Sequence, residues 1–448
     1  MSFPRYPKYK DSGVEWLGQV PEHWQVKRLR FVAELNPPKS ELRGLDRETV
    51  VSFLPMEAIG DDGSLSLESD KKVGEVENGY TYFRDGDVVL AKITPCYENG
   101  KGAVMRGLRN GIGFGTTELI VARPLPTESL AHYLHYLFIS SDFRRIGEAH
   151  MYGAGGQKRV PDDFVRDFVT AFPPLAEQTR IATLLDRETG KIDELVAEQQ
   201  RLMGLLKEKR QAVISHAVTK GLNPHAPMKP SGIEWLGKIP EHWAISHLRR
   251  LVAEDTTITY GIVQAGPHVD NGIPYIRTSD MSGDKLPEDG YLRTTPEIDA
   301  SFSRSKVKPN DLVVAIRASL GKGLLVPTHL NGANLTQGTA RISPGKRLLP
   351  RFLFWSFNSD YCQTSIRTVA KGTTFLEITL DALRRIAVAA PPLAEQDAIV
   401  AFLDRAIVAI DVLMSEAEKA VDLLQERRTA LISAAVTGQI DVRELAVS

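Results

Sequence analysis

The sequence predicts an α+β fold, with two globular α/β domains separated by two long antiparallel, coiled-coil-like helices in a pseudo-two-fold tandem repeat. The first observation is a duplicated aromatic-rich segment, SGVEWLGQVPEHW at 12–24 and SGIEWLGKIPEHW at 231–243. The second is PPLAEQ, which stands at 173–178 and again at 391–396. The spacing between the two copies stays constant to within one residue. Such constancy along a whole chain indicates a duplication.

The stretches 175–217 and 393–435 predict the two long helices. Both lack proline and carry apolar residues at spacings of three, four and seven, as in a coiled coil. Gly221 and Gly438 are expected to end them. A helix of about 43 residues is roughly 65 Å long and exposes its stripe unless paired, so each is expected to pack against the other. The predicted helix-pair interface is Leu185, Ile192, Leu195, Leu202, Leu206, Leu403, Ile410, Leu413, Leu424 and Leu431.

The two remaining blocks differ from each other and are expected to be mixed α/β domains. Apolar runs at 87–93, 118–122 and 311–316 predict strands, and 130–139 and 349–357 predict helices. The expected divisions are an opening segment 1–24, a first block 25–172, a central helix 173–220, a linker with a second opening segment 221–243, a second block 244–390, and a final helix with its tail 391–448.

Composition narrows the class of protein. With 42% hydrophobic and 25% charged residues, the chain is expected to fold, whereas a net charge of −1 says nothing for or against nucleic acid. No apolar stretch resembles a signal sequence or a membrane span. Cys96 and Cys362 share no motif, which fits a reducing compartment. These features predict a cytoplasmic protein.

Sequence motifs for catalysis are incomplete. Asn36-Pro37-Pro38 resembles a motif of amino-methyltransferases, but Lys39 stands where an aromatic residue would stack on the base. The glycines of 111–115 are not followed by the pattern of a nucleotide-binding helix, and no phosphate-binding GxxxxGK[ST] is present. Pro161-Asp162-Asp163 resembles the first part of a nuclease motif, but no Asp/Glu-x-Lys follows soon after it. The sequence therefore predicts no catalytic residue and no cofactor in this chain.

Histidines do not predict a metal site. His132 and His135 lie three residues apart on an expected helix, but no further ligand is evident, so packing or surface roles are favoured. His23 and His242 belong to the repeated Glu-His-Trp. Their recurrence predicts a structural role at the start of each block.

Several loops combine glycine with lysine or arginine, the residues that can contact phosphates and base edges. A single such residue is more often a solvated surface charge, but the two blocks carry these loops at comparable places. Lys101 follows the strand-like run that begins at Asp87, and Lys322 follows the one that begins at Asp311. The predicted DNA-binding residues are Lys92, Lys101, Gln157, Lys158, Arg159, Arg277, Arg317, Lys322, Lys371, Thr373 and Thr374.

The paired PPLAEQ…LDR…ID helices, the paired EWLG-x-(V/I)PEHW segments and the run GDVVLAKITPCYENGKGAV resemble the specificity subunits of type I restriction–modification systems. That resemblance spans essentially the whole chain. It implies two target-recognition domains, each reading one half of a bipartite and, because the blocks differ, asymmetric DNA target. It also implies two modification subunits that methylate adenine with AdoMet, and restriction subunits that use ATP and Mg²⁺, so the cofactors belong to the partners.

Two other functions stay open on the sequence: a fused DNA-modifying enzyme, which would need an intact AdoMet motif, and a coiled-coil interaction scaffold without a DNA role. Two structural expectations follow from the duplication. The segment 12–24, which no helix precedes, is expected to pack near 436–448. The long helices are expected to set the separation of the two half-sites.

Overall fold

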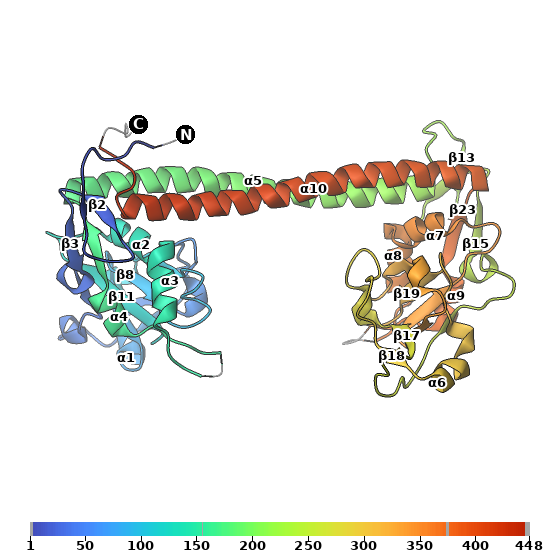
Figure 1. The fold of residues 1–448 in the computed structure, drawn as a ribbon, viewed down its shortest axis with the longest axis horizontal. Coiled ribbons are helices and arrows are strands. Elements are labelled where there is room, and N and C mark those ends of the chain that lie inside the picture. Colours follow the sequence, from blue (N-terminus) through green and yellow to red (C-terminus); the bar gives the residue numbers. More distant parts are fainter. Residues whose placement is uncertain (1–2, 155, 373–375, 444–448) are drawn as a thin grey trace. The chain divides into compact units, whose positions relative to one another are not determined.

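The computed structural model describes residues 3–154, 156–372 and 376–443. The chain forms two compact units. Unit 1 combines residues 1–200 with 419–448, and unit 2 consists of residues 201–418. Each unit therefore holds one opening segment, one α/β block and one end of each long helix (Figure 1).

Both long helices are present as predicted. The first, α5, spans Leu175–Lys220, and the second, α10, spans Leu393–Val436. Each helix follows a Pro-Pro pair, and the residue that precedes a proline is disfavoured in helical conformation, so neither helix begins earlier. Gly221 and Gly438 follow the helices with φ of 74° and 76°, a left-handed conformation that glycine adopts without strain. The predicted helix ends are confirmed.

The helices pair antiparallel within each unit. In unit 1, the Arg428 guanidinium of α10 donates to Asp193 of α5 at 2.9 Å. In unit 2, Arg210 of α5 donates to Asp411 of α10 at 3.1 Å. These aspartates are the repeated Ile-Asp of the sequence, and each contacts an arginine from the other helix. The motif is therefore duplicated because both ends of the helix pair use the same contact.

Part of the predicted helix interface is wrong. Leu195, Leu202 and Leu413 are 45%, 41% and 55% exposed and do not lie in the seam. The residues of α5 that turn inward are spaced alternately by four and three, as a 3.5-residue repeat requires, and they are Ile192, Val196, Gln199, Met203 and Leu206. Leu195 and Leu202 each stand one position before an inward-facing residue, so their side chains lie at the side of the contact between the two helices. The other predicted residues are buried or half-buried: Leu185, Ile192, Leu206, Leu403, Ile410, Leu424 and Leu431.

The block of unit 1 is built on two four-stranded sheets, ordered β6-β5-β10-β7 and β4-β11-β8-β9. Two smaller antiparallel pairs, β1-β2 and β3-β12, connect it to the long helices. The strands are β1 Tyr9–Asp11, β2 Gln19–Pro21, β3 Gln25–Arg28, β4 Ala33–Leu35, β5 Val50–Leu54, β6 Asp70–Lys72, β7 Thr81–Arg84, β8 Val88–Ala91, β9 Gly102–Val104, β10 Ile112–Gly115, β11 Leu119–Pro124 and β12 Val169–Phe172. The helices are α1 Val73–Val76, α2 Ala131–Ile139, α3 Ser141–Ala149 and α4 Asp162–Asp167.

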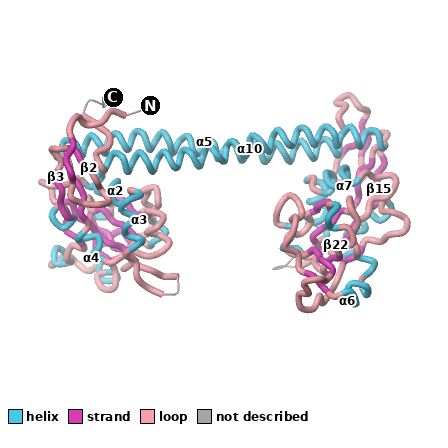
Figure 2. Tube along the Cα trace, in the orientation of Figure 1, coloured by secondary structure: helices cyan, strands magenta, loops and turns pink. Residues whose placement is uncertain are grey.

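Unit 2 repeats this plan with the orders β16-β22-β19-β20 and β18-β17-β21, and with pairs β13-β14 and β15-β23. Figure 2 shows the strands of each unit gathered in its block, with short helices beside them. The strands are β13 Met228–Pro230, β14 Lys238–Pro240, β15 Ala244–His247, β16 Thr259–Tyr260, β17 Ile273–Ile276, β18 Arg293–Thr294, β19 Leu312–Ala315, β20 Gly323–Leu325, β21 Asn334–Leu335, β22 Thr339–Ile342 and β23 Ala387–Ala390. The helices are α6 Pro296–Ser301, α7 Pro350–Phe357, α8 Asp360–Val369 and α9 Leu380–Arg385.

The ends of the long helices belong to the cores of the blocks. In unit 1, Leu185 of α5 and Ile432 of α10 join the cluster that contains Trp24. In unit 2, Val218 of α5 and Leu403 of α10 join the cluster around Trp243. Each block is therefore fixed to both helices by a shared apolar core. The predicted fold class is confirmed, including all five predicted strands and helices of the blocks.

Candidate nucleic-acid interface

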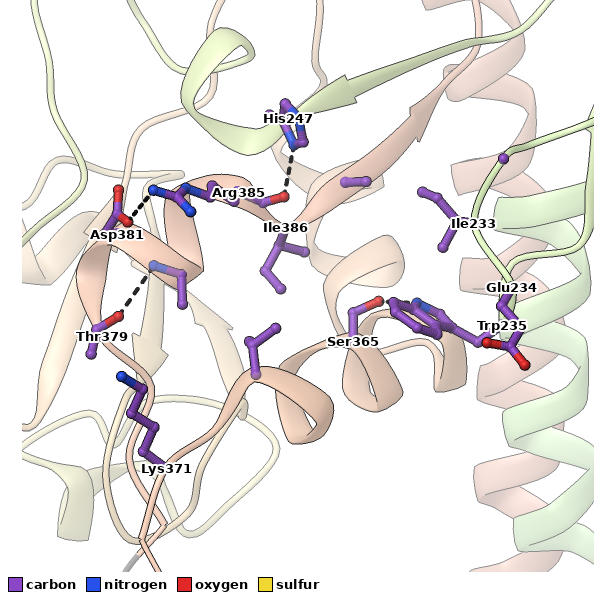
Figure 3. A pocket seen from close by; sticks show the side chains of 14 residues that line it. Ile233, Glu234, Trp235, His247, Ser365, Lys371, Thr379, Asp381, Arg385 and Ile386 are labelled. Carbon is purple, nitrogen blue, oxygen red and sulfur yellow. Dashed lines mark hydrogen bonds and ion pairs between the residues drawn. The ribbon is translucent and has the colours of Figure 1, made fainter.

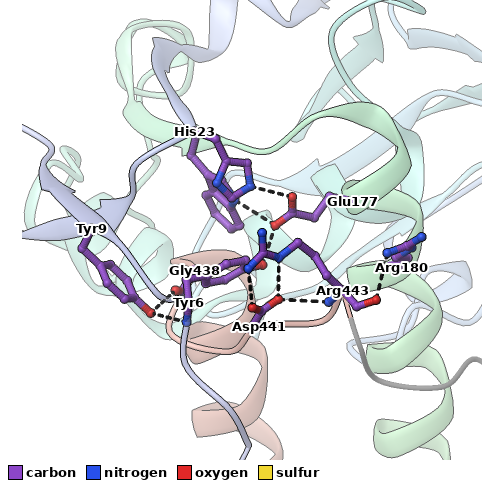
Figure 4. Close-up of polar contacts among 9 residues, drawn as sticks. Tyr6, Tyr9, His23, Glu177, Arg180, Gly438, Asp441 and Arg443 are labelled. Atoms are coloured by element: carbon purple, nitrogen blue, oxygen red, sulfur yellow. Dashed lines mark hydrogen bonds and ion pairs between the residues drawn. The ribbon is translucent and has the colours of Figure 1, made fainter.

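A buried polar clamp joins the opening segment of unit 1 to the first turn of α5 (Figure 4). The Glu177 carboxylate accepts hydrogen bonds from the Trp24 indole at 3.0 Å and from the phenol of Tyr6, and it lies 2.8 Å from Nε2 of His23. An acid in this first turn is also favoured by the helix dipole. Burial and the neighbouring Glu177 raise the pKa of Tyr6.

Unit 2 repeats the clamp. Glu395 of α10 accepts from the Trp243 indole at 3.1 Å and lies 2.8 Å from Nε2 of His242. The structural role predicted for the repeated histidines is confirmed. The glutamate of PPLAEQ thus holds the Glu-His-Trp of the opening segment in both units.

The glutamine of PPLAEQ has a second task. The Gln178 side chain accepts from the backbone of Leu130 at 3.0 Å, immediately before α2, and donates to the carbonyl of Glu128 at 2.9 Å. Gln396 makes the equivalent contacts with Leu349 at 2.8 Å and Arg347 at 2.9 Å. The motif therefore positions both the opening segment and the first main helix of the block.

The predicted packing of the opening segment near the end of the chain is confirmed within unit 1. The Tyr9 hydroxyl donates to the carbonyl of Gly438 at 3.0 Å, and the Gln439 side chain donates to the carbonyl of Gln19 at 3.3 Å. A side chain at 438 would clash, because a Cβ there would lie 2.4 Å from the Pro21 ring. In unit 2, Gly221 lies in the same position, against Trp243.

In unit 1, three of the predicted DNA-binding residues lie on one hairpin. Tyr152 and Arg159 exchange backbone hydrogen bonds of 3.1 and 2.9 Å, and Arg159 also bridges to Ile93, just after β8. Gln157 and Lys158 are exposed near the tip. Arg159 is not free, because its guanidinium donates to the Glu118 carboxylate at 2.7 and 2.9 Å.

Unit 2 carries the equivalent hairpin. Lys371 and Glu377 exchange backbone hydrogen bonds of 2.8 and 2.9 Å, and Glu377 bridges to Arg317, just after β19. Lys371 is exposed, and Arg317 donates to the Glu377 carboxylate at 2.9 Å. The predicted Thr373 and Thr374 lie outside the described residues.

The predicted correspondence of Lys101 and Lys322 is confirmed. Each lies directly before an equivalent strand, β9 or β20. Both amines donate to backbone carbonyls of a neighbouring loop, Lys101 to Met56 at 3.1 Å and Lys322 to Ser282 at 2.7 Å. These two lysines therefore anchor loops in the structure.

The two remaining predicted cations also have acidic neighbours. Lys92 lies 3.6 Å from Asp162, and Arg277 donates to Asp280 at 2.7 Å. Among the predicted cations and amides, Gln157, Lys158 and Lys371 are the exposed members that the hairpins bring forward.

Sequence reasoning missed the acids that hold the hairpins and one exposed aromatic residue. Glu118 and Glu377 contact arginines distant in the sequence, and Tyr152 is 63% exposed at the base of its hairpin. A glutamate directly before a buried strand is the only local signal for Glu118. Nothing near Glu377 in the sequence indicates its partner.

The residues of the incomplete motifs have structural contacts. Asn36 accepts from the backbone of Val121 at 3.0 Å and donates to Asp162 at 2.9 Å. Contact with Asp186 raises the pKa of His132, whereas burial lowers the pKa of His135 to about 4. In the part of the chain that the structure describes, no cluster of His, Cys, Asp and Glu could hold a metal ion. None of its described helices is long and apolar enough to cross a membrane.

Unit 2 contains a cavity of about 670 Å³ between its opening segment, α8 and α9 (Figure 3). The Trp235 indole donates to the Ser365 hydroxyl on one side of the cavity, and Lys371, Ala382 and Ile386 also line its wall. The cavity therefore adjoins the hairpin of unit 2.

Sequence comparisons place the chain among known proteins. Residues 264–419 match the family model described as the type I restriction modification DNA specificity domain. The EcoEI specificity subunit of Escherichia coli is 42% identical over 189 residues, which cover 42% of this chain and 31% of that protein. The putative MjaX specificity subunit of Methanocaldococcus jannaschii is 23% identical over 443 residues, covering 95% of this chain and 96% of that protein.

Solved structures share the fold. A chain from a structural study of the assembly and conformational transition of the type I R-M system gives a TM-score of 0.74 at 21% identity, covering 94% of this chain and 99% of that one. The HsdS subunit from Thermoanaerobacter tengcongensis gives 0.55 at 19% identity, covering 94% and 98%.

The chain therefore shares the fold of these solved chains, with two α/β blocks of the same plan and two long helices. Residues 264–419 thus match a type I restriction modification DNA specificity domain, and the chain is similar in sequence to type I restriction enzyme specificity subunits. It matches 31% of the length of the EcoEI and EcoAI relatives.

Proposed function

We propose that the chain is the DNA-binding specificity subunit of a type I restriction–modification complex and that it reads a bipartite, asymmetric target. The observation that carries this proposal is the pair of equivalent hairpins, 152–159 and 371–377, on a duplicated frame. Both present exposed polar or basic residues, as contact with phosphates and base edges requires. Each block reads one half-site.

The difference between the hairpins supports an asymmetric target. The first carries Gln157 and Lys158 near its tip, whereas the second carries Lys371 at its base. An amide can donate to and accept from adenine, and a lysine donates to guanine, so different side chains select different bases. Two identical readers on the same frame would instead select a symmetric target.

In this proposal the chain has no catalytic role of its own and recruits the subunits that carry out catalysis. Two modification subunits methylate adenine with AdoMet, and restriction subunits use ATP and Mg²⁺. Exposed leucines on the long helices support a docking surface: Leu202, Leu205 and Leu413 in unit 2, and Leu195 and Leu423 in unit 1. Exposed apolar residues gathered on a helix pair are typical of protein interfaces. Their occurrence in both units supports two copies of the partner, and the complex acts in the cytoplasm.

The long helices set the spacer between the half-sites. Inserting four residues within 180–210 lengthens a helix by about 6 Å, close to two base pairs. The spacer is expected to change while both half-sites stay the same. Altered half-sites would contradict this role of the helices.

Methylome sequencing of a host with and without the chain tests the proposed function. A single bipartite adenine-methylated motif should disappear on deletion, and Lys158→Ala should relax only one half of that motif. Lys371→Ala should relax only the other half. An unchanged modification map would leave an interaction scaffold as the better explanation, and a gel shift with the modification subunit present separates DNA binding from methylation.

A further inference from the structure

The two hairpins are attached to their blocks by the same backbone contacts. In unit 1, the amide of Val160 donates to the carbonyl of Lys92 at 2.8 Å. In unit 2, the amide of Ile378 donates to the carbonyl of Ile316 at 3.1 Å. Each contact follows the last hairpin residue and reaches the segment directly after β8 or β19. Arg159 and Glu377 therefore occupy the same position in the repeat.

The side chains at this shared position have opposite charges. In unit 1 the hairpin carries the arginine, and the acid, Glu118, precedes β11. In unit 2 the hairpin carries the acid, Glu377, and the arginine, Arg317, follows β19. An ion pair braces the base of each hairpin, but its polarity is reversed.

Reversed polarity makes the hairpins incompatible with each other's block. A hairpin with Arg159 placed in unit 2 would bring that arginine beside Arg317. A hairpin with Glu377 placed in unit 1 would bring that glutamate beside Glu118. Like charges in contact repel, so the base of a transplanted hairpin would open.

We propose that Glu118 and Arg317 are positioning residues, which fix the two DNA-reading hairpins through Arg159 and Glu377 and make each hairpin specific to its own block. This inference rests on the proposed function, because it assumes that the hairpins read DNA. The Arg159 and Arg317 guanidinium groups then act on the target through the hairpin backbone, and the exposed residues Gln157, Lys158 and Lys371 make the contacts. Exposed ion pairs contribute little to global stability, so loss of a brace should leave the chain folded.

Charge reversal in the full complex tests the proposal. Arg159→Glu should lower the discrimination between the correct first half-site and single-base mismatches by roughly tenfold or more, the size of a lost base contact. Discrimination at the second half-site should not change. The double variant Arg159→Glu/Glu118→Arg restores an ion pair with swapped polarity and should recover at least half of the lost discrimination on a logarithmic scale. Arg317→Glu and Arg317→Glu/Glu377→Arg should give the same result at the second half-site.

Arg145→Glu is the matched control, because it reverses an exposed arginine of the same block that pairs with Asp142 of its own helix, α3, and not with a hairpin residue. Methylation of a library of target variants gives both discriminations from one sample, and thermal unfolding confirms the folded state. If Arg159→Glu behaves like Arg145→Glu, or if the double variant is no better than the single one, the brace is not a positioning device. A wild-type chain without effect on the library would instead refute the proposed function.

Discussion

The aromatic layer of unit 1 and the cavity of unit 2 occupy the same place in the repeat. In unit 1, the Phe168 ring lies 5.1 Å from the Trp16 ring and 4.9 Å from the Phe143 ring, and Phe164 completes the cluster. In unit 2, the corresponding residues are smaller: Ala382 and Ile386 line the cavity beside Trp235, and Cys362 stands at the position of Phe143. The space that rings fill in one unit is open in the other.

This difference shows which contacts the duplicated frame depends on. The clamps of Trp24 with Glu177 and of Trp243 with Glu395 are nearly identical. The layer between the opening segment and the hairpin has diverged. Residues that fix the block to the long helices are thus the same in both units, and residues between the opening segment and the hairpin differ.

The largest expected effect tests the shared clamp. Trp24→Ala and Trp243→Ala should each destabilise their own unit by about 3–5 kcal/mol, because both indoles are fully buried. Hydrogen exchange resolved by unit measures the two effects separately. A cost that differs by more than about 2 kcal/mol between the units would break the equivalence of the clamps.

The second-largest effect on stability is expected from a buried ion pair, and its size should differ between the two units. Arg123 donates to both oxygens of Asp87 at 2.7 and 2.8 Å, whereas in unit 2 the register of β19 with β22 places Ser343 at the position of Arg123. Asp87→Asn should cost about 3 kcal/mol, because it leaves a buried arginine without its main partner. Asp311→Asn should cost about 1 kcal/mol, since that carboxylate accepts from the Lys308 amide. Equal costs in denaturant unfolding would contradict this reading.

Exchanging the residues of the aromatic layer should produce a smaller effect. Phe168→Ile makes unit 1 resemble unit 2 and should cost about 1–2 kcal/mol through an unfilled space. Ile386→Phe is the reciprocal change. It should be tolerated or slightly stabilising, because the new ring can enter the existing cavity. A destabilising Ile386→Phe would show that the cavity wall cannot accept a ring.

The smallest effect concerns pH. His132 lies 3.6 Å from Asp186, and this contact raises the pKa of the imidazole above its usual value. In unit 2, Arg351 takes the position of His132 and contacts Asp404 at 3.0 Å. The stabilisation from His132 is complete below its unfolded pKa and is lost as pH rises through the higher folded pKa. It should be below about 1 kcal/mol, since both side chains are half-exposed and screened.

Titration of His132 by NMR measures the raised pKa directly. Asp186→Asn should return it toward its ordinary value. The contact between Arg351 and Asp404 should not change over the same pH range, because a guanidinium stays charged. An imidazole pKa that is insensitive to Asp186→Asn would show that the carboxylate is not its cause.

The sequence predicts the elements with strong local signals. Pro-Pro at the start and Gly221 or Gly438 at the end define the long helices, and the buried strands follow from their apolar runs. The prediction of Leu195 at the helix interface is wrong. A 3.5-residue repeat fits equally well when it is shifted by one residue, to Val196, and only packing against the partner helix decides which residues face inward.

The polar details of the interface depend on distant pairing. Arg159 and Glu118 stand 41 residues apart and meet only through the register of β8 and β11 with the hairpin. Sequence alone selected Arg159 as a DNA-binding residue without indicating that an acid would hold it. The cavity of unit 2 likewise depends on several residues that are smaller than their counterparts in unit 1, and no single sequence motif reveals them together.

The way the two units share the chain has a consequence for its synthesis. Unit 2 is one uninterrupted segment, residues 201–418, so all of its parts are available as soon as residue 418 has left the ribosome. Unit 1 begins earlier but also needs residues 419–448, including the α10 turns that pack on Trp24 and the glycine that receives Pro21. The half that is made first is therefore the half that is completed last, and a nascent chain halted just after residue 418 would hold every residue of unit 2 while unit 1 still lacked its second helix.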